Sequence, residues 1–375
     1  MTTLYWDITT HCNARCRYCS ALPTRHQQAL AFPSLQQVEE ALERLATAGV
    51  GRLILLGGEP TLRPDLLEIV RLAHARGMSV GIATNALALD GALARGLLAR
   101  EGVSLNVSLD SPFADENDAL RGGGYLARAR TNLMRLLALR RAGDSPVAVT
   151  IQATLTRLNL GRLEETLERF LAWGVDGVLL ERLRGYPWQP PDVRALVPDP
   201  GEWILGAVRA ARVAARTARS SPSGNGRGGA RARILLNYGH ARLRRALAER
   251  FASDWSRERY CPGGLTVAVL ANDGGLHPCR HVAQQPPARD RRGRPHYRQA
   301  RLCAWDPGAE RFLESPYFVD FFNFAHAGTT YAQLALCRAC PEYEICEPCP
   351  LDVARRGEQV LGECRWLATR GVPDA

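Results

Sequence analysis

Apolar and polar positions follow two different periodicities through the first half of the chain, one typical of strands and one typical of helices. Short apolar runs bounded by glycine or polar residues predict β-strands at residues 4–10, 52–58, 78–85, 103–110, 147–156 and 178–182. Between these runs, apolar residues recur at helical spacing and predict helices at residues 34–49, 65–77, 90–101, 124–143 and 162–174. Ser34 is a candidate N-cap for the first helix.

The alternation of strand and helix indicates an α/β fold with parallel strands and right-handed crossovers. Six such units suit a partial (β/α)6 TIM-like barrel better than a closed eight-stranded one, and we expect it over residues 1–184. The pattern is weaker in a bridging region at 185–259. This region contains a Ser-, Gly- and Arg-rich segment near 219–233, which predicts a flexible linker. A small cysteine-rich C-terminal domain then occupies residues 260–375.

The formal net charge of +10 raises the question of nucleic-acid binding. All 48 basic residues are arginine, and they are spread over the helices rather than gathered in one stripe. A solvated basic surface is therefore favoured over nucleic-acid recognition. The sequence has no apolar run of about 18 residues that predicts a membrane span, and its N-terminus lacks the layout of a signal peptide. We expect a cytoplasmic protein.

Cysteine is abundant for such a protein, because disulfides are disfavoured in the cytoplasm. Of eleven cysteines, three lie between Cys12 and Cys19 and eight lie from Cys261 onward. Thiols in such numbers usually bind metals. The distribution indicates metal chemistry near both ends of the sequence.

The first cysteine group, a C-x3-C-x2-C array, directly follows the first predicted strand and contains Cys12, Cys16 and Cys19. Three thiolates on a four-iron cube leave one iron open to a substrate or cofactor. The alternative is zinc, which prefers four closed ligands in structural sites. His11 is too near Cys12 in sequence to complete such a site comfortably, so an iron–sulfur cluster is favoured.

A second motif, Gly57-Gly58-Glu59-Pro60, ends the second predicted strand. In barrel-like α/β folds, chemistry occurs at the carboxyl ends of the strands. The two glycines would let a ligand approach the backbone, and Glu59 could accept a hydrogen bond from an ammonium group. Taken alone, the tetrapeptide is equally typical of a tight turn.

Together the two motifs resemble the radical S-adenosylmethionine (SAM) superfamily, through Cys12, Cys16, Tyr18, Cys19 and the Gly-Gly-Glu-Pro segment. The resemblance covers about residues 4–182. It implies that the three cysteines hold a [4Fe-4S] cluster that binds SAM, and that the segment contacts the methionine amino group. Tyr18 is expected to pack near the adenine. The further SAM-site residues that the resemblance implies are Gly57, Gly58, Glu59, Pro60, Thr84, Asn85, Ser108 and Asp110.

One departure concerns the residues after Asp110, where Ser111-Pro112 stands in place of the glycine of many relatives. Glu181 and Arg182, at the end of the sixth strand, are further candidates to face SAM or substrate. The alternative is that either residue belongs to a surface ion pair.

The C-terminal cysteines begin with a C-x12-G-x4-C segment that is typical of a hairpin, followed by C-x2-C-x5-C-x2-C and a final cysteine. The layout resembles the SPASM extension of radical SAM enzymes, which holds two auxiliary [4Fe-4S] clusters. The resemblance assigns one cluster to Cys261, Cys279 and Cys349. It assigns the other to Cys337, Cys340, Cys346 and Cys364.

Two questions about this region stay open. Relatives usually carry C-x3-C where this chain has the shorter Cys346-Glu347-Pro348-Cys349, and a zinc-ribbon interaction module is an alternative for the region alone. The remaining Cys303 has three interpretations: a fourth ligand of the first auxiliary cluster, a catalytic hydrogen-atom donor, or a buried thiol.

The resemblance implies an enzyme, a radical SAM oxidoreductase, maturase or epimerase. Such enzymes cleave SAM reductively to a 5′-deoxyadenosyl radical, which abstracts hydrogen from the substrate. The first hypothesis for the substrate is a ribosomally made peptide that is cross-linked, oxidised or epimerised. A second is an aminosugar or other small molecule of natural-product biosynthesis. A third reading from another class is a zinc-stabilised nucleic-acid-binding protein.

The resemblance also implies partners. A flavodoxin or ferredoxin is the expected electron donor, and no membrane partner is expected. The predicted barrel begins at residue 4, which leaves no room for a leader-peptide-binding domain before it. We therefore expect a separate leader-peptide-binding protein if the substrate is a peptide.

Overall fold

The computed structural model describes residues 2–19, 33–185, 189–220, 233–236, 241–251, 267–271, 275–277, 279, 337 and 361–373. A nine-stranded sheet runs through them in the order β7-β6-β5-β4-β3-β2-β1-β8-β9. Its strands are β1 Thr2–Thr9, β2 Val50–Gly57, β3 Ser79–Thr84, β4 Val103–Ser108, β5 Ala148–Leu155, β6 Gly177–Arg182, β7 Arg233–Leu236, β8 Val267–Leu270 and β9 Leu276–His277.

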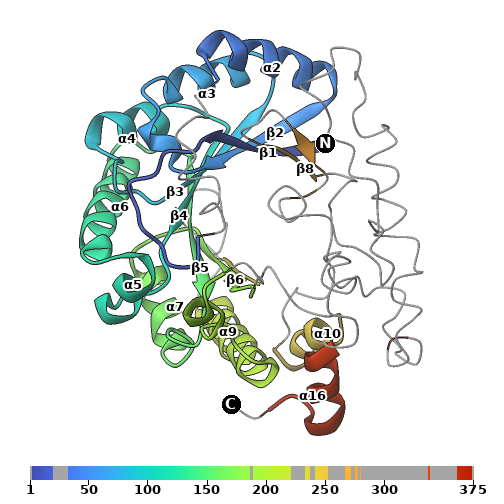
Figure 1. The fold of residues 1–375 in the computed structure, drawn as a ribbon. Helices are drawn as coiled ribbons and strands as arrows, with labels where there is room; N and C mark the ends of the chain where they lie inside the picture. The colour runs from blue at the N-terminus through green and yellow to red at the C-terminus, as the bar shows by residue number, and fades with distance from the viewer. Residues whose placement is uncertain are drawn as a thin grey trace.

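All neighbouring strands from β7 to β8 pair in parallel, and only β8 and β9 are antiparallel. The sheet is curved and unclosed, with β7 and β9 at the two ends of the strand order (Figure 1). The predicted partial α/β barrel is therefore confirmed, and its six expected strands are β1 to β6.

The helices that connect the strands cover the convex face of the curved sheet (Figure 1). Among the helices described, none combines the length and apolar composition that crossing a bilayer requires. The helices are α2 Leu35–Thr47, η1 Pro60–Leu62, α3 Leu66–His74, α4 Gly91–Leu98, α5 Ala114–Arg121, α6 Tyr125–Ala142, α7 Leu163–Ala172, α8 Pro191–Arg194, α9 Pro200–Ser220, α10 Ala241–Phe251 and α16 Gly362–Arg370.

The hydrophobic core lies between the sheet and these helices. Leu4, Trp6 and Ile8 of β1 point into it and are buried, as are Leu53 and Leu55 of β2. Because side chains alternate across a strand, the residues between them face the concave side. The concave side is where the cavity described below lies.

The first connecting helix starts where the sequence predicts. Ser34 caps α2 by accepting a hydrogen bond from the Gln37 amide, and the Gln37 side chain accepts one from the Ser34 amide. This reciprocal pair satisfies two donors that a helix start otherwise leaves unpaired.

Several elements were not predicted, and helix α9 is the longest of them. Helix α9 lies in the region where the pattern is weak, because much of its buried face is alanine, including Ala207, Ala210 and Ala211. Alanine contributes little to an apolar periodicity. The linker expected near 219–233 overlaps the end of α9, and residues 221–232 lie outside the described part.

The sheet continues beyond the expected barrel region. Strand β7, from the bridging region, pairs with β6, and β8, from the expected C-terminal domain, pairs with β1. The antiparallel pair β8–β9 lies between Cys261 and Cys279, where the spacing predicts a hairpin. The division into three domains stays a prediction, and one sheet contains strands from all three segments.

Candidate active site

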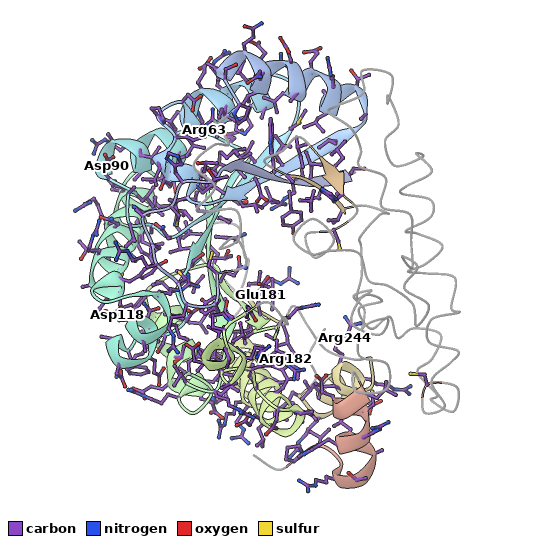
Figure 2. All side chains as sticks on the ribbon, in the orientation of Figure 1. Arg63, Asp90, Asp118, Glu181, Arg182 and Arg244 are labelled. Carbon is purple, nitrogen blue, oxygen red and sulfur yellow. The ribbon has the colours of Figure 1, made fainter. Side chains whose placement is uncertain are left out.

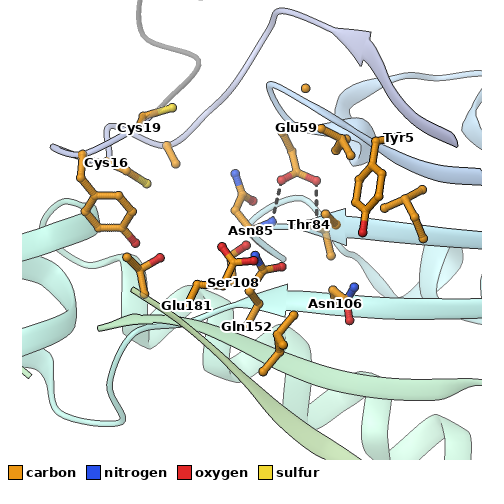
Figure 3. A pocket seen from close by; sticks show the side chains of 18 of the residues that line it. Tyr5, Cys16, Cys19, Glu59, Thr84, Asn85, Asn106, Ser108, Gln152 and Glu181 are labelled. Atoms are coloured by element: carbon orange, nitrogen blue, oxygen red, sulfur yellow. Dashed lines mark hydrogen bonds between the residues drawn. The ribbon is translucent and has the colours of Figure 1, made fainter. Parts of the chain in front are cut away.

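A cavity of about 700 Å³ opens at the carboxyl ends of β1 to β6, on the concave face of the sheet (Figure 3). It brings together most of the residues that the sequence singles out, from loops far apart in the chain. Those on its wall are Cys12, Cys16, Tyr18, Cys19, Gly57, Gly58, Glu59, Thr84, Asn85, Ser108, Glu181 and Arg182.

The three cysteines of the loop after β1 are partly exposed and line this cavity. Two side-chain donors approach their sulfur atoms: Asn85 Nδ2 lies 3.8 Å from Cys12 Sγ, and Arg121 Nη1 lies 3.9 Å from Cys16 Sγ. N–H donors stabilise the negative charge that a thiolate-bound iron–sulfur cluster carries. Among the residues that the structure describes, no three or more His, Cys, Asp or Glu side chains lie in positions to bind a single metal ion.

The cysteine loop is anchored to helices that follow much later in the sequence. The Arg17 amide donates to the Leu120 carbonyl at 2.9 Å, at the end of α5. The Arg17 side chain forms an ion pair with Asp192 of α8, at 2.9 Å. Tyr18 packs against a small apolar cluster that includes Leu120 and Leu183. Helices α5 and α8 therefore help to set the position of the thiols.

Gly57 and Gly58 permit a close approach between two backbone segments. A Cβ on Gly57 would lie 2.3 Å from the Thr9 carbonyl oxygen, and one on Gly58 would lie 2.1 Å from that of His11. Gly57 also has a φ of +119°, which favours glycine. The Gly58 amide donates to Thr9 and the Glu59 amide donates to His11, at 2.6 and 2.7 Å. The glycines thus hold the start of the cysteine loop against the end of β2.

Glu59 is buried, and its carboxylate accepts four hydrogen bonds. Oε1 accepts from the amide and hydroxyl of Thr61. Oε1 also accepts from the hydroxyl of Thr84, and Oε2 accepts from the Asn85 amide (Figure 3). Burial raises the pKa of Glu59, and the hydrogen bonds from Asn85, Thr61 and Thr84 act in the opposite direction. A carboxylate oxygen has about two acceptor sites. Oε2, which accepts one of the four hydrogen bonds, therefore retains acceptor capacity.

Asn85 joins this carboxylate to the cysteine loop. Its Nδ2 donates at 2.7 Å to Oδ1 of Asn13, a residue between Cys12 and Cys16 in the sequence. Its Oδ1 accepts from the Leu87 amide at 2.8 Å. The ends of β2 and β3 and the loop after β1 are thereby tied into one hydrogen-bonded unit. Pro60 is buried at the start of η1 and is not on the cavity wall.

Asp110 lies behind the cavity wall, with no exposed surface. Arg121 of α5 binds its carboxylate in a bidentate pair, with Nε and Nη2 each 2.8 Å from an oxygen. The Tyr18 hydroxyl and the Thr154 amide donate to the same carboxylate. All of these donors come from the protein itself, so the carboxylate serves mainly to hold Arg121 and Tyr18 in place.

Arg121 is the site residue that the sequence reasoning missed. Helix α5 was not among the predicted helices, although acidic residues Asp115 and Glu116 in its first turn and Gly122 after its end are typical helix boundaries. Burial raises the pKa of the Cys16 thiol to about 11, and the charge of Arg121 opposes that rise. Arg121 is thus the nearby positive charge that favours the thiolate form of Cys16.

The deeper wall of the cavity is polar. Asn106 and Ser108 of β4, and Gln152 and Thr154 of β5, alternate with buried apolar residues and face the cavity (Figure 3). Strands that are buried on both faces are expected to be continuously apolar. The polar alternation in residues 103–108 and 148–155 is therefore the sequence signal that could have located this wall.

The end of β6 connects the cavity to the C-terminal helix. Glu181 and Arg182 lie on the concave side of the sheet (Figure 2). Arg182 forms a largely buried ion pair with Glu363 of α16, and its Nη2 donates to the Pro198 carbonyl at 2.9 Å. Arg182 thus belongs to an ion pair, as the alternative interpretation expected, but this pair is largely buried and not on the surface.

Three of the expected auxiliary ligands are described, and all are partly exposed: Cys279 after β9, Cys337, and Cys364 in α16. Glu363, the partner of Arg182, directly precedes Cys364. The other C-terminal cysteines with an expected role lie outside the described residues, namely Cys261, Cys303, Cys340, Cys346 and Cys349.

Comparison with known families and proteins matches the sequence profile of the Radical SAM superfamily to residues 6–170. Mycofactocin maturase MftC of Mycobacterium ulcerans (strain Agy99) is 35% identical over 163 residues, which is 43% of this chain and 42% of that protein. The match thus spans less than half of the length of that relative. PqqA peptide cyclase of Ruegeria pomeroyi is 29% identical over 286 residues, covering 75% of this chain and 68% of the cyclase.

Solved structures share the fold. Streptococcus suis SuiB bound to S-adenosylmethionine superimposes with a TM-score of 0.66 at 14% identity, covering 94% of this chain and 73% of SuiB. At this identity the likeness supports the architecture, and it agrees with the unclosed α/β sheet described above.

Proposed function

We propose that this chain, in which residues 6–170 form a radical SAM domain, is an iron–sulfur enzyme that cleaves SAM reductively and modifies a ribosomally made peptide. The observation that carries the proposal is the convergence of Cys12, Cys16 and Cys19 on one cavity with Glu59 and Asn85. The sequence motifs that implied the family thus lie together at the carboxyl ends of the strands.

The residues present fit a cluster with one open iron. Three partly exposed thiols line the cavity, and two N–H donors, from Asn85 and Arg121, approach their sulfur atoms. When bound there, a reduced four-iron cluster supplies the electron that breaks a carbon–sulfur bond of SAM, and hydrogen abstraction from substrate then yields 5′-deoxyadenosine.

The chain's own residues bind and orient the reactants. Glu59 Oε2 can accept a hydrogen bond from the methionine ammonium of SAM, since it accepts one hydrogen bond from the protein and Glu59 lines the cavity. Ser108 and Gln152 are register partners on β4 and β5 and present a hydroxyl and an amide on the same wall. A hydroxyl and an amide that can each donate and accept suit a polar substrate such as a peptide backbone.

The peptide class is supported by two relatives, a mycofactocin maturase and a PqqA peptide cyclase. In this proposal the C-terminal cysteines hold two auxiliary [4Fe-4S] clusters. Cys261, Cys279 and Cys349 bind one, and Cys337, Cys340, Cys346 and Cys364 bind the other. A flavodoxin or ferredoxin delivers the electrons, and a separate protein presents the peptide leader.

The test is 5′-deoxyadenosine formation by anaerobically reconstituted protein supplied with SAM and dithionite. The wild type is expected to form 5′-deoxyadenosine and methionine, and a Cys12→Ala/Cys16→Ala/Cys19→Ala variant is expected to form neither while retaining iron bound elsewhere. Equal product from both proteins, or none from fully loaded wild type, contradicts the proposal. Stimulation by an aminosugar but not by precursor peptides would favour the small-molecule alternative.

A separate prediction concerns Glu59. Glu59→Gln removes the charge that receives the ammonium, and an N–H of the new amide then opposes the Asn85 amide at 2.6 Å. A hydrogen bond to a charged group contributes about 1.5–3 kcal/mol, so SAM affinity is expected to fall roughly 10- to 150-fold.

Equilibrium dialysis with labelled SAM measures this effect. The matched control is Glu116→Gln, because Glu116 is also a buried acid with a hydrogen bond from a hydroxyl, that of Ser111, but it lies off the cavity wall. Equal losses of SAM affinity in the two variants would remove the assignment of Glu59 as the ammonium acceptor.

A further inference from the structure

We infer that Arg121 is a positioning residue that sets the reduction potential of the SAM-binding cluster through Cys16. The inference rests on the proposed function, because it assumes that Cys12, Cys16 and Cys19 hold that cluster. Neither the family motifs nor the sequence pattern assigned a role to this arginine.

The guanidinium of Arg121 is held by hydrogen bonds and by contacts with aromatic rings. Its Nε and Nη2 bind Asp110, its third nitrogen, Nη1, lies 3.9 Å from Cys16 Sγ, and the side chain is nearly buried. The rings of Tyr18 and Tyr125 flank it, with centroids 5.7 and 5.5 Å from the guanidinium carbon. Nη1 is therefore held toward the sulfur while the two other nitrogens are occupied by the carboxylate.

Asp110 is in turn held by groups other than Arg121. The Tyr18 hydroxyl and the Thr154 amide donate to its oxygens, and its own amide donates to Asn117 Oδ1 at 3.0 Å. The anion thus lies on the far side of the guanidinium from Cys16. For a cluster ligated by Cys16, the Arg121 guanidinium is therefore nearer than the Asp110 carboxylate.

This order of charges has a direct electrostatic consequence. Reduction adds one negative charge to the cluster, and a nearby positive charge in a low-dielectric site stabilises the reduced form. Hydrogen bonds to the ligating sulfur and the local net charge are known determinants of cluster potential. Arg121 is therefore expected to make the cluster easier to reduce, and Asp110 to offset part of that effect.

The experiment is an EPR-monitored redox titration of the reconstituted full-length protein, with iron and sulfide measured in parallel. The signal followed is the one whose g values change on adding SAM, which identifies the cluster with an open iron. The variants are Arg121→Gln and the double variant Arg121→Gln/Asp110→Asn, which leaves no unpaired buried charge. The matched control is Arg52→Gln, because Arg52 lines the same cavity but hydrogen-bonds to Ser104.

Arg121→Gln is expected to shift the midpoint potential to a more negative value, and the double variant to shift it less in the same direction. Arg52→Gln is expected to retain the wild-type potential. An unchanged potential in Arg121→Gln, or an equal shift in Arg52→Gln, overturns the inference. Loss of the SAM-responsive cluster from both Arg121 variants, with the cluster intact in Arg52→Gln, overturns it too, since the role would then be structural.

Failure of the proposed function would look different. In that case the wild type itself would show no SAM-responsive signal and form no 5′-deoxyadenosine. A wild type that passes both of these measurements confines any negative result to the role of Arg121.

Discussion

Gly58→Ala is expected to abolish assembly of the SAM-binding cluster and 5′-deoxyadenosine formation. The added Cβ would lie 2.1 Å from the His11 carbonyl oxygen, and a backbone atom cannot move aside as a flexible side chain can. Relief of the clash requires the cysteine loop to leave β2, breaking the hydrogen bonds from the Gly58 and Glu59 amides. Overpacking typically destabilises by about 1–3 kcal/mol, and a clash with backbone atoms is at the upper end of this range. Iron content per chain, measured after reconstitution, should fall by one four-iron cluster.

The matched control is Gly123→Ala, in the turn between α5 and α6. A Cβ there meets no atom within 4 Å, and the backbone is not left-handed. This variant is expected to keep its iron. Its free energy of unfolding is expected to rise by about 0.4–1 kcal/mol, because alanine restricts the conformations of the unfolded chain. Wild-type iron and activity in Gly58→Ala would show that the contact between the loop and β2 is dispensable.

Asp110→Ala is expected to lower the free energy of unfolding by about 3–5 kcal/mol, because it leaves the buried charge of Arg121 without its partner. The variant also loses the acceptor of two hydrogen bonds, because in the wild type the Tyr18 hydroxyl and the Thr154 amide donate to this carboxylate. Urea unfolding followed by circular dichroism measures the effect as a lower midpoint.

Asp192→Ala provides the comparison, since Asp192 also pairs with an arginine of the same neighbourhood, Arg17. That pair is exposed, with 39% and 61% of the two side chains accessible, so solvent screens it. Its removal is expected to leave the urea midpoint unchanged. A midpoint for Asp110→Ala equal to that of Asp192→Ala would contradict the buried-pair account.

Much of this architecture can be predicted from the sequence, because local patterns specify it. The apolar runs around Leu53 and Leu105 predict β2 and β4, and Ser34 predicts the start of α2. The cysteine triad and the Gly-Gly-Glu-Pro segment are contiguous motifs that follow strands, and parallel strands bring their carboxyl ends together. Their meeting in one cavity follows from topology.

Other features depend on contacts between distant residues, which no local pattern encodes. The sequence suggests that Gly57 and Gly58 make room for a ligand. In the structure, they make room for the backbone of Thr9 and His11. The pairing of Asp110 with Arg121 required α5, a short helix whose apolar periodicity is weak. The ion pair of Arg182 with Glu363 joins segments that are far apart in the sequence.

The pairing of β1 with β8 has a consequence for the time course of biosynthesis. Thr3 pairs with Val267, so one neighbour of the strand that leads into the cysteine loop is synthesised only after about 260 further residues. At about 5–20 residues per second, the nascent strand waits roughly 13–50 s for that neighbour. Throughout this interval one side of β1 is an open edge, able to pair with other chains. Ribosome speed and chaperone supply should therefore govern the yield of correctly folded protein.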